Sequence, residues 1–230
     1  MTILRPQPSL SEQVYDAIVD QICAGSLPAG SHLVQEQLAE RLGVSRQPVQ
    51  QAMALLKADG LVEDIGRRGL RVTPLDADLV GHHYALRAAL DGLSARLAAQ
   101  RIAAGEVASG IFTQAADDIL SAGQAAVAAD DVAGQVRHDE ALHTLIYRTS
   151  GNPLVTRTAA PHWRFLRRAM AEVLRRATLP REIWDQHARI VAAIAAGDAE
   201  GAEAQMVDHD LAAARTLVTA LRAPQPAEAR

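Results

Sequence analysis

Four side chains in the second half of the chain have the types and spacing of a metal site. Asp139 and His143 are four residues apart, so on a helix they project from one face, about 6 Å apart along the axis. A carboxylate and an imidazole placed in this way can share one divalent metal ion. The same spacing also occurs in ordinary surface pairs, so these two residues alone leave both interpretations open.

Two further histidines strengthen the metal interpretation. His187 precedes Gly197 by ten residues, and His209 follows Gly197 by twelve. If two helices form an antiparallel hairpin that turns at this glycine, each histidine lies roughly 15–18 Å from the turn. The two imidazoles would then stand at similar heights on neighbouring helices. Together with Asp139 and His143 they suffice for a site of three histidines and one carboxylate inside a helical bundle.

The segments that must position these residues are helical. We predict five or six helices in the second part of the chain, because its stretches rich in Ala and Leu are separated by Gly, Pro, Asn or Asp. We expect no strand after Val72, so residues 75–223 predict an all-α helical bundle and residues 224–230 a disordered tail. The predicted helices are Asp78–Ile102, Glu106–Ala128, Asp131–Thr149, Pro153–Ala177, Pro180–Ala196 and Asp198–Arg222.

A different pattern lies nearer the N-terminus. The stretch Leu38–Val62 contains most of two short predicted helices, which meet at a tight turn. The first covers Gln35–Leu42, and Gly43 supplies the conformational freedom that a helix end requires. We expect Ser45 to cap the start of the second helix with its side chain.

The second of these helices predicts an apolar face and a polar face. Val49, Met53 and Leu56 recur at i, i+4 and i+7, which is the spacing of one buried stripe. The polar side carries one arginine and three amides, and such side chains suit the edges of guanine and adenine in the major groove. This arrangement is typical of a helix-turn-helix, although a solvated helical hairpin is the alternative. The polar residues are Arg46, Gln47, Gln50 and Gln51.

A wing is predicted directly after these helices. Leu61-Val62 and Leu70–Val72 are expected to be two short strands on either side of Gly66-Arg67-Arg68-Gly69. Two glycines around two arginines form a hairpin tip that can approach a phosphate backbone closely. With a further helix from Ser9 or Ser11 to about Ala24, residues 1–74 predict a winged helix-turn-helix domain.

At this point the sequence resembles a known family. The run GSHLVQEQLAERLGVSRQPVQQAMALLKADGLVEDIGRRGLRV is similar to the winged helix-turn-helix of the GntR family of bacterial transcription regulators, whose pattern is close to L-A-x-x-L-G-V-S-R-T-P-V-R-E-A-L. Gln47, Gln50 and Gln51 depart from that pattern, which has Thr, Arg and Glu there, so we expect an unusual operator sequence. The resemblance implies contacts to double-stranded operator DNA from Ser45, Arg46, Gln47, Gln50, Gln51, Arg67, Arg68 and Gly69.

The helical part resembles the FCD effector domain of the FadR subfamily of these regulators. The matching runs are D-E-A-L-H-T-L-I-Y-R-T-S-G-N, H-A-R-I-V-A-A-I-A-A-G-D-A-E-G-A and D-H-D-L, and the resemblance covers residues from about 10 to 222. In metal-containing members the ligands are one Asp and three His. This implies a divalent ion, zinc first with nickel or manganese as alternatives, on Asp139, His143, His187 and His209. It also implies a small carboxylate effector bound at the ion.

Three arginines are candidates for binding such an effector. Arg87 and Asp91 match the R-x-x-L-E pattern of the family with Asp in place of Glu, and a structural ion pair is the alternative. Arg164 and Arg167 follow Trp163, and an arginine offers a planar, two-pronged donor to a carboxylate. A solvated basic face is the alternative for these two.

Composition limits the setting in which the protein works. The single cysteine, Cys23, cannot form an intramolecular disulfide, which fits a reducing compartment. No leader opens the chain, and no apolar run reaches the roughly 20 residues of a membrane span. We therefore expect a cytoplasmic protein with no membrane partner. A net charge of −4 neither supports nor excludes DNA as a partner.

The resulting hypothesis is a ligand-responsive transcription regulator that binds a pseudo-palindromic operator as a homodimer. A metal-dependent enzyme is one alternative, because three histidines and a carboxylate also hold hydrolytic metals. That alternative needs a proton-transferring group beside the ion, and the sequence suggests none. A metal-sensing regulator, in which the ion itself is the signal, is the other alternative.

Overall fold

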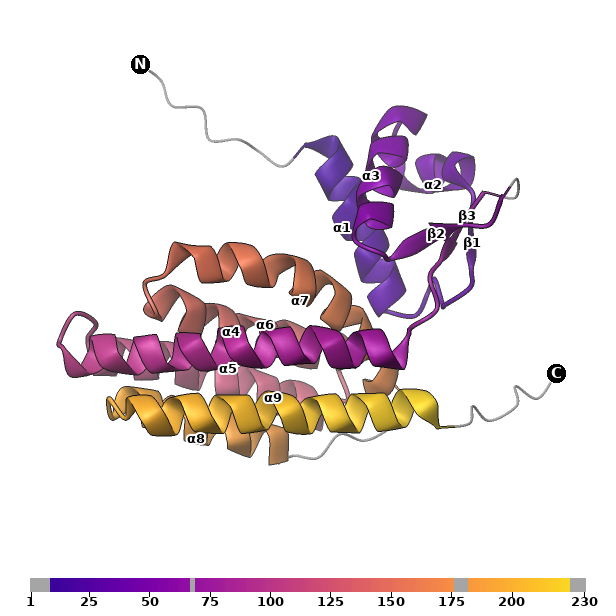
Figure 1. Ribbon diagram of the computed structural model, residues 1–230. Coiled ribbons are helices and arrows are strands. Elements are labelled where there is room, and N and C mark those ends of the chain that lie inside the picture. The colour runs from indigo at the N-terminus through magenta and orange to yellow at the C-terminus, as the bar shows by residue number, and fades with distance from the viewer. Residues whose placement is uncertain (1–8, 67–68, 176–181, 224–230) are drawn as a thin grey trace, which may run out of the picture. The chain divides into compact units, whose positions relative to one another are not determined.

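The computed structural model describes residues 9–66, 69–175 and 182–223, and the chain divides into two compact units (Figure 1). The first unit extends to Pro74 and the second begins at Leu75. Each unit has its own buried core and is described by itself.

The first unit is a helix-turn-helix with a small sheet. Its helices are α1 (Leu10–Cys23), α2 (Gln35–Leu42) and α3 (Arg46–Ala58), and its strands are β1 (His32–Leu33), β2 (Val62–Asp64) and β3 (Leu70–Val72). The three strands form an antiparallel sheet in the order β1-β3-β2. A capping box starts α1, because the backbone N–H of Glu12 donates to Ser9 Oγ and the backbone N–H of Ser9 donates to the Glu12 carboxylate.

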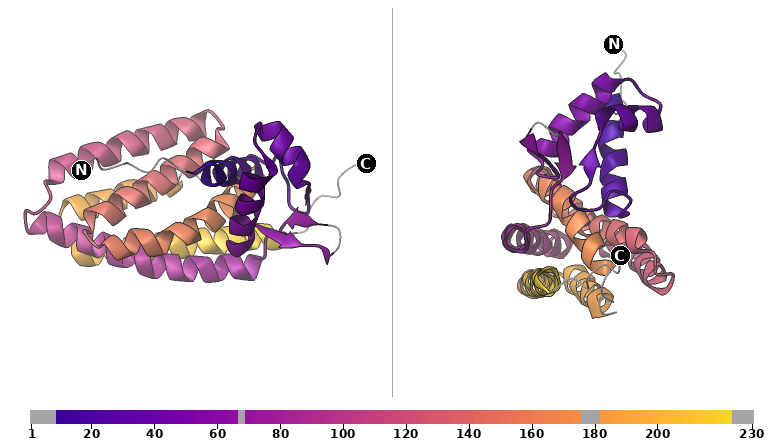
Figure 2. Two further views of the ribbon diagram at one scale, coloured as in Figure 1. Left: turned by 90° about the horizontal axis from the view of Figure 1, so that it is seen from above. Right: turned by 90° about the vertical axis from the view of Figure 1, so that its right-hand side faces the viewer.

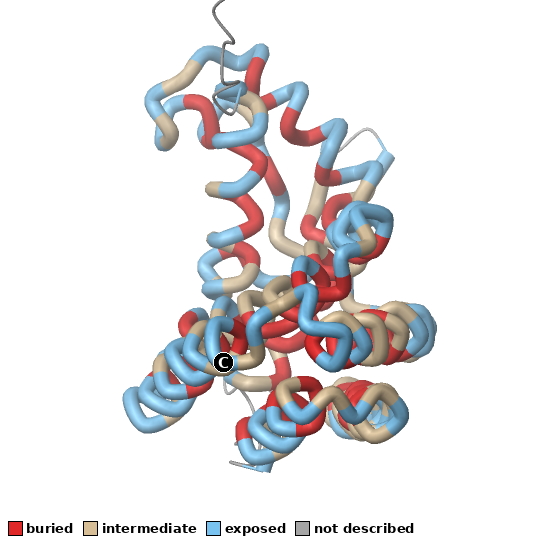
Figure 3. Tube along the Cα trace, turned by 90° about the vertical axis from the view of Figure 1, so that its left-hand side faces the viewer, coloured by how far each residue is buried: buried red, intermediate tan, exposed pale blue. Residues whose placement is uncertain are grey.

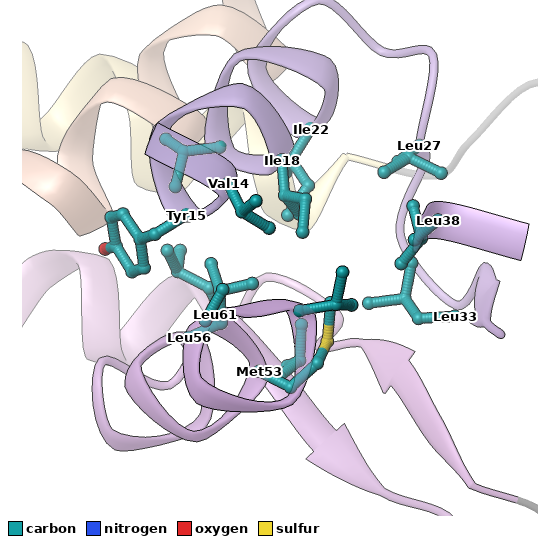
Figure 4. Packing of buried hydrophobic residues seen from close by; sticks show 14 of the residues in the cluster. Val14, Tyr15, Ile18, Ile22, Leu27, Leu33, Leu38, Met53, Leu56 and Leu61 are labelled. Carbon is teal, nitrogen blue, oxygen red and sulfur yellow. The ribbon is translucent and has the colours of Figure 1, made fainter. Parts of the chain in front are cut away.

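One hydrophobic cluster holds this unit together (Figure 4). Ile18 of α1 is fully buried against the apolar face of α3, and Leu61 closes the cluster from the segment before β2. The predicted stripe of Val49, Met53 and Leu56 is buried, as its spacing indicates. Burial of that stripe leaves the polar side of α3 facing solvent.

The wing differs from the prediction in two respects. The sheet has three strands rather than two, because His32 and Leu33 pair with β3. A strand of two residues is too short for any alternation in the sequence to reveal it. In addition, β2 begins at Val62 and continues to Asp64, so the predicted strand at Leu61-Val62 is displaced towards the hairpin tip.

The second unit is entirely helical in its described residues, and its six helices correspond to the six predicted segments. The first helix, α4, and the last, α9, make the most extensive contact and run side by side (Figures 1 and 2). All described helices are too short or too polar to span a bilayer. The helices are α4 (Ala77–Ala103), α5 (Ser109–Ala128), α6 (Val132–Thr149), α7 (Pro153–Leu174), α8 (Glu182–Ala195) and α9 (Ala199–Arg222).

Two boundaries of the prediction need comment. The second helix of the bundle begins at Ser109 rather than Glu106, because the chain first turns through Gly105, whose φ is +73°. The predicted end of the fourth helix and start of the fifth fall within residues 176–181, and the predicted tail covers residues 224–230. Both segments lie outside the described residues.

Buried positions recur along one side of each bundle helix (Figure 3). On α8, the position of the helix depends on a close contact between Trp184 and Gly123. The indole of Trp184 rests on Gly123 of α5, where a Cβ would lie only 1.9 Å from a ring atom. The same indole meets the ring of His187 edge-on at a centroid distance of 5.2 Å. Gly123 therefore supports the aromatic residue that packs beside a predicted metal ligand.

Replacing Gly123 by Ala tests this support. We expect Gly123→Ala to lower the unfolding free energy of the helical unit by about 1–3 kcal/mol, because the added methyl group overpacks the indole. Gly110→Ala on the same helix is the matched control, since nothing lies within 4 Å of its Cβ position. The control should be neutral or stabilising by up to about 1 kcal/mol. Denaturant titration followed by tryptophan fluorescence measures both, and equal values for the two variants would contradict this account.

Candidate metal centre and nucleic-acid interface

The structure brings the four predicted metal ligands together. Asp139 and His143 come from α6, His187 from α8 and His209 from α9, and one ligand atom from each lies within 4.8 Å of all the others. The Nε2 atom of His187 lies 3.1 Å from Nε2 of His209 and 3.2 Å from Asp139 Oδ1. The three imidazoles are buried, whereas the side chain of Asp139 keeps 14% exposure.

Neighbouring groups fix which nitrogen of His143 carries its proton. Nη2 of Arg87 lies 2.7 Å from His143 Nε2. A guanidinium can only donate, so Nε2 of His143 must accept and the ring proton sits on Nδ1. Nδ1 in turn lies 2.7 Å from Asp91 Oδ2, so the carboxylate attracts that proton although the two groups are not aligned for a hydrogen bond. A carboxylate behind an imidazole raises the basicity of the opposite nitrogen.

The same reasoning applies to the other two histidines. Gln186 Oε1 lies 2.8 Å from Nδ1 of His209 and can only accept, so Nε2 of His209 has a free lone pair. Nε2 of His187 must then carry the proton in its contacts with His209 and Asp139. Its Nδ1 is buried without a hydrogen-bond partner among the described residues. Two imidazoles therefore present lone pairs to the centre, and the third presents a proton.

Arg87 carries positive charge into the same region. Its Nε lies 3.1 Å from Asp91 Oδ2 and 3.2 Å from Asp210 Oδ1, and its Nη2 lies 3.5 Å from Asp139 Oδ2. The guanidinium also stacks over the ring of Trp163, 4.1 Å from the centroid, as cation–π contacts require. The guanidinium is almost fully buried, so it serves as the counter-charge for three carboxylates from α4, α6 and α9.

Burial and charge shift the protonation equilibria of these groups. Burial alone would raise the pKa of Asp139, but the hydrogen bond from His187 and the charge of Arg87 outweigh it and place that pKa far below its ordinary value. Burial lowers the pKa of His209, and the neighbouring imidazoles of His187 and His143 lower it further. The centre therefore presents an ionised carboxylate and a neutral His209 imidazole at neutral pH, which are the forms that bind metal ions.

Some contacts and one acidic residue of this centre were not predicted. Asp91 pairs with Arg87 as expected, but it also contacts His143 and accepts a hydrogen bond from Tyr147. Asp210 joins Asp91 and His143 in a second buried group with metal-ligand chemistry. Burial and the charge of Asp91 raise the pKa of the Asp210 carboxyl well above its ordinary value. In the sequence, the position of Asp210 directly after His209 in the run D-H-D-L was the one indication that this carboxyl lies near the centre.

The other two candidate arginines, Arg164 and Arg167, lie on α7. Arg167 approaches the carboxylate of Glu140 at 3.6 Å, and both side chains are partly buried. Arg164 is half-buried on the same helix. Effector binding by Arg164 and Arg167 stays a prediction, whereas Arg87 at least lies against the proposed ligands.

In the first unit, the polar side of α3 is exposed as its spacing predicts. Arg46, Gln47, Gln50 and Gln51 all face solvent. Ser45 occupies the N-cap position, but its side chain makes no hydrogen bond to the helix start, so the predicted side-chain cap is wrong. The reason is local, since the hydroxyl faces solvent with the rest of this surface.

The basic residues of this surface are paired with acids. Arg46 forms an ion pair with Glu36 at the start of α2, and Arg71 of β3 pairs with Glu63 of β2 at 2.6 Å. Gly69 has a φ of +101°, and its carbonyl accepts from the backbone N–H of Ile65 to close the hairpin. Arg67 and Arg68 lie outside the described residues.

Comparison with known protein families accounts for both units. The profile of the FCD domain matches residues 82–213, and the profile of the bacterial regulatory proteins of the gntR family matches residues 10–72. A probable D-xylose utilization operon transcriptional repressor of Paenarthrobacter nicotinovorans is 31% identical over 87% of this chain and 85% of its own length.

Other relatives match over a shorter length. The HTH-type transcriptional regulator YdhC of Bacillus subtilis is 36% identical over 37% of this chain, and the match spans only 38% of that protein. Among solved structures, E. coli McbR/YncC superposes with a TM-score of 0.79 over 93% of this chain and 99% of its own. A putative transcriptional regulator GntR from Rhodococcus sp. RHA1 superposes with a TM-score of 0.76 over 92% of this chain and 99% of its own. At 20% and 19% identity these two show the fold alone.

Removal of the buried guanidinium should be costly. We expect Arg87→Met to lower the unfolding free energy of the metal-free helical unit by about 3–5 kcal/mol, because it leaves buried carboxylates without their counter-charge. Arg96→Met on the same helix is the control. Arg96 pairs with Glu203 at 3.5 Å with both side chains more than a third exposed, so its loss should cost at most about 1 kcal/mol. Both tryptophans lie in this unit, so their fluorescence reports its unfolding, and a small loss in Arg87→Met would contradict the assigned charge balance.

Proposed function

Since the chain belongs to the GntR family of bacterial regulatory proteins and carries an FCD domain, we propose that it is a transcription regulator whose operator affinity responds to a small carboxylate held at a divalent metal ion. The observation that carries the proposal is the convergence of Asp139, His143, His187 and His209 in one buried centre of the FCD domain. The family and the relatives are transcriptional regulators rather than enzymes.

The donor set supports an ion of the zinc class. Three imidazole nitrogens and one carboxylate oxygen suit zinc, and nickel or manganese are alternatives with related ligand preferences. His143 and His209 already direct lone pairs inward, supported by Asp91 and Gln186. His187 would have to move its proton from Nε2 to Nδ1, which has no acceptor among the described residues, so this change has a free-energy cost that the bound ion must offset. A bound ion would supply positive charge and an open coordination position for a carboxylate.

Arg87 supports a link between this centre and the rest of the bundle. Its Nη2 donates to the same His143 lone pair that an ion would take, while its Nε contacts Asp91 and Asp210. Occupation of the centre therefore requires Nη2 of Arg87 to leave His143. Arg87 belongs to α4, which begins at Ala77 directly after the boundary between the units. A change at the centre is thereby transmitted to the helix that follows the DNA-binding unit, and operator affinity changes in response.

The reading surface is the start of α3. In a homodimer, two copies of α3 would enter successive major grooves of a pseudo-palindromic operator, with the Arg67-Arg68 tip near the phosphates. Ser45 and Gly69 would contact the backbone, while Arg46, Gln47, Gln50 and Gln51 would meet base edges. In the free protein Arg46 forms an exposed ion pair with Glu36, which it would exchange for the base contact.

A metal-sensing regulator is the second candidate function. The contact between Arg87 and His143 favours it, because an ion alone would displace this contact without any organic ligand. Measuring operator affinity for the metal-free, the metal-loaded and the acid-supplemented protein separates the two. A change on adding the ion alone identifies a metal sensor, whereas a change only with the acid supports the proposed function.

Replacing one ligand tests the metal-bound effector. We expect His187→Ala to lose most of its bound metal and to keep its operator affinity, because the first unit has a separate core. The variant should no longer respond to a short carboxylate. His82→Ala, an exposed histidine of α4, is the control and should keep both metal and response. Metal analysis and DNA titration measure these outcomes. A full metal content in His187→Ala would show that the site is misassigned, and an intact response without metal would remove the ion from effector binding.

Arg46 provides a separate test of the reading surface. We expect Arg46→Ala to weaken binding to an operator selected from randomised DNA by about 1–3 kcal/mol, with a loss that depends on the base opposite. Arg41→Ala is the control, because Arg41 hydrogen-bonds to Gln21 on the α1 side of the same motif. Fluorescence anisotropy with the selected operator and its base variants gives both values. Equal losses for the two variants, or the same loss on every operator, would contradict a base contact by Arg46.

A further inference from the structure

Two small cavities flank Asp139 in the helical unit. The first has a volume of about 40 Å³ and opens onto Arg87, Asp139 and His209. Apolar side chains, among them Met170 and Leu217, line the same cavity. The cavity therefore combines charged and imidazole groups of the proposed metal centre with an apolar lining.

The second cavity, of about 50 Å³, lies on the other side of a shared wall. Asp139, Met170 and Ile183 line both cavities, so these three side chains form the partition between them. Beyond the partition the second cavity is lined mainly by apolar residues such as Val136 and Leu174. Neither cavity is large, and each is lined in part by Asp139.

The volumes limit the size of a ligand. A cavity of this kind needs roughly 10–15 Å³ for each water molecule, so the first has room for about three waters. A ligand whose carboxylate lies at the centre and whose tail enters this cavity thus has space for only a few further non-hydrogen atoms. Chains of about two to four carbons fit one cavity, and longer chains need the partition to move.

The lining also limits the polarity of a ligand. Thr216 and Tyr84 bring the two hydroxyl groups of the first cavity, and the Thr216 hydroxyl already donates to the carbonyl of Ala212. A sugar acid has several hydroxyl groups, and each one buried without a partner costs about 1–3 kcal/mol. Arg87 is the one cationic side chain among the described lining residues, and its guanidinium already contacts Asp91, Asp139 and Asp210. A second carboxylate would therefore compete with three carboxyl groups of the protein for this one cation.

We propose that the effector is a short, unbranched aliphatic monocarboxylate whose tail occupies the cavity between α4, α7 and α9, and that dicarboxylates and sugar acids are excluded. This inference rests on the proposed function, because it assumes that the carboxylate binds at the metal centre. It assigns chain-length selection to Met170 and Ala213, which line the apolar part of the cavity.

The first experiment compares acids on the zinc-loaded, full-length protein bound to its selected operator. The panel is acetate, butyrate, hexanoate, succinate and a five-carbon sugar acid, and the measurement is the acid concentration that half-maximally changes DNA affinity. Butyrate should act at a concentration at least about tenfold lower than hexanoate, succinate or the sugar acid, because one or two misfitting groups produce differences of that size.

Two neighbouring alanines of α9 provide a matched pair of variants. Ala213 lines the inner cavity, whereas Ala212 lines the groove between α8 and α9 on the outer side of His209. Ala213→Leu should fill the apolar part and abolish the response to butyrate while keeping that to acetate. Ala212→Leu should respond as the wild type does. Met170→Ala should join the two cavities and improve hexanoate relative to butyrate by about tenfold, which provides a test if Ala213→Leu does not fold.

The outcomes distinguish this inference from the function on which it rests. A metal-dependent response that is strongest to succinate or to the sugar acid would overturn the inference and leave the proposed function standing. Unchanged chain-length preference in Ala213→Leu and Met170→Ala would also overturn it. A lack of response to every acid by protein that carries its metal would contradict both.

Discussion

The helical unit depends on the neutralisation of charge in its interior. Arg87, Asp91 and Asp210 are at most 3% exposed and come from two helices that run side by side, while Asp139 reaches the same guanidinium from a third. An isolated charge in such a place would cost several kcal/mol, so Arg87 and the carboxylates that share it depend on one another's positions. This requirement ties α4, α6 and α9 into one arrangement, and the imidazoles complete it.

The same charges decide which proton sits on which nitrogen. Because Arg87 can only donate, His143 must direct a lone pair towards the centre, and Gln186 imposes the equivalent condition on His209. His187 alone presents a proton there. The centre is thus organised for ligation in two of its three imidazoles and needs one tautomeric change in the third. Competition between Arg87 and an ion for one lone pair would give the proposed coupling its physical basis, since it would oblige a side chain of α4 to move.

Much of this could be predicted from the sequence. The spacing of Asp139 and His143, and of His187 and His209 about Gly197, predicted two pairs of neighbours, because helical rise and a hairpin turn fix those positions. The resemblance to the FCD domain joined the two pairs in one predicted site, and the structure brings all four side chains together. The stripe on α3 predicted its buried face for the same reason. The partners of Arg87 could not be found in this way, because Asp91 and Asp210 meet it only through the packing of α4 on α9. The strand at His32 and the uncapped Ser45 were missed because two residues carry no periodicity and a cap depends on one rotamer.

Anomalous diffraction at the zinc absorption edge, from crystals of the zinc-loaded protein, tests the central claim most directly. The account predicts one strong peak per chain, with Nε2 of His143, His187 and His209 and one oxygen of Asp139 at about 2.0–2.2 Å. It also predicts that Nη2 of Arg87 no longer contacts His143. A peak at surface histidines, at Cys23 or at Asp210, or no peak in crystals that contain zinc, would contradict it.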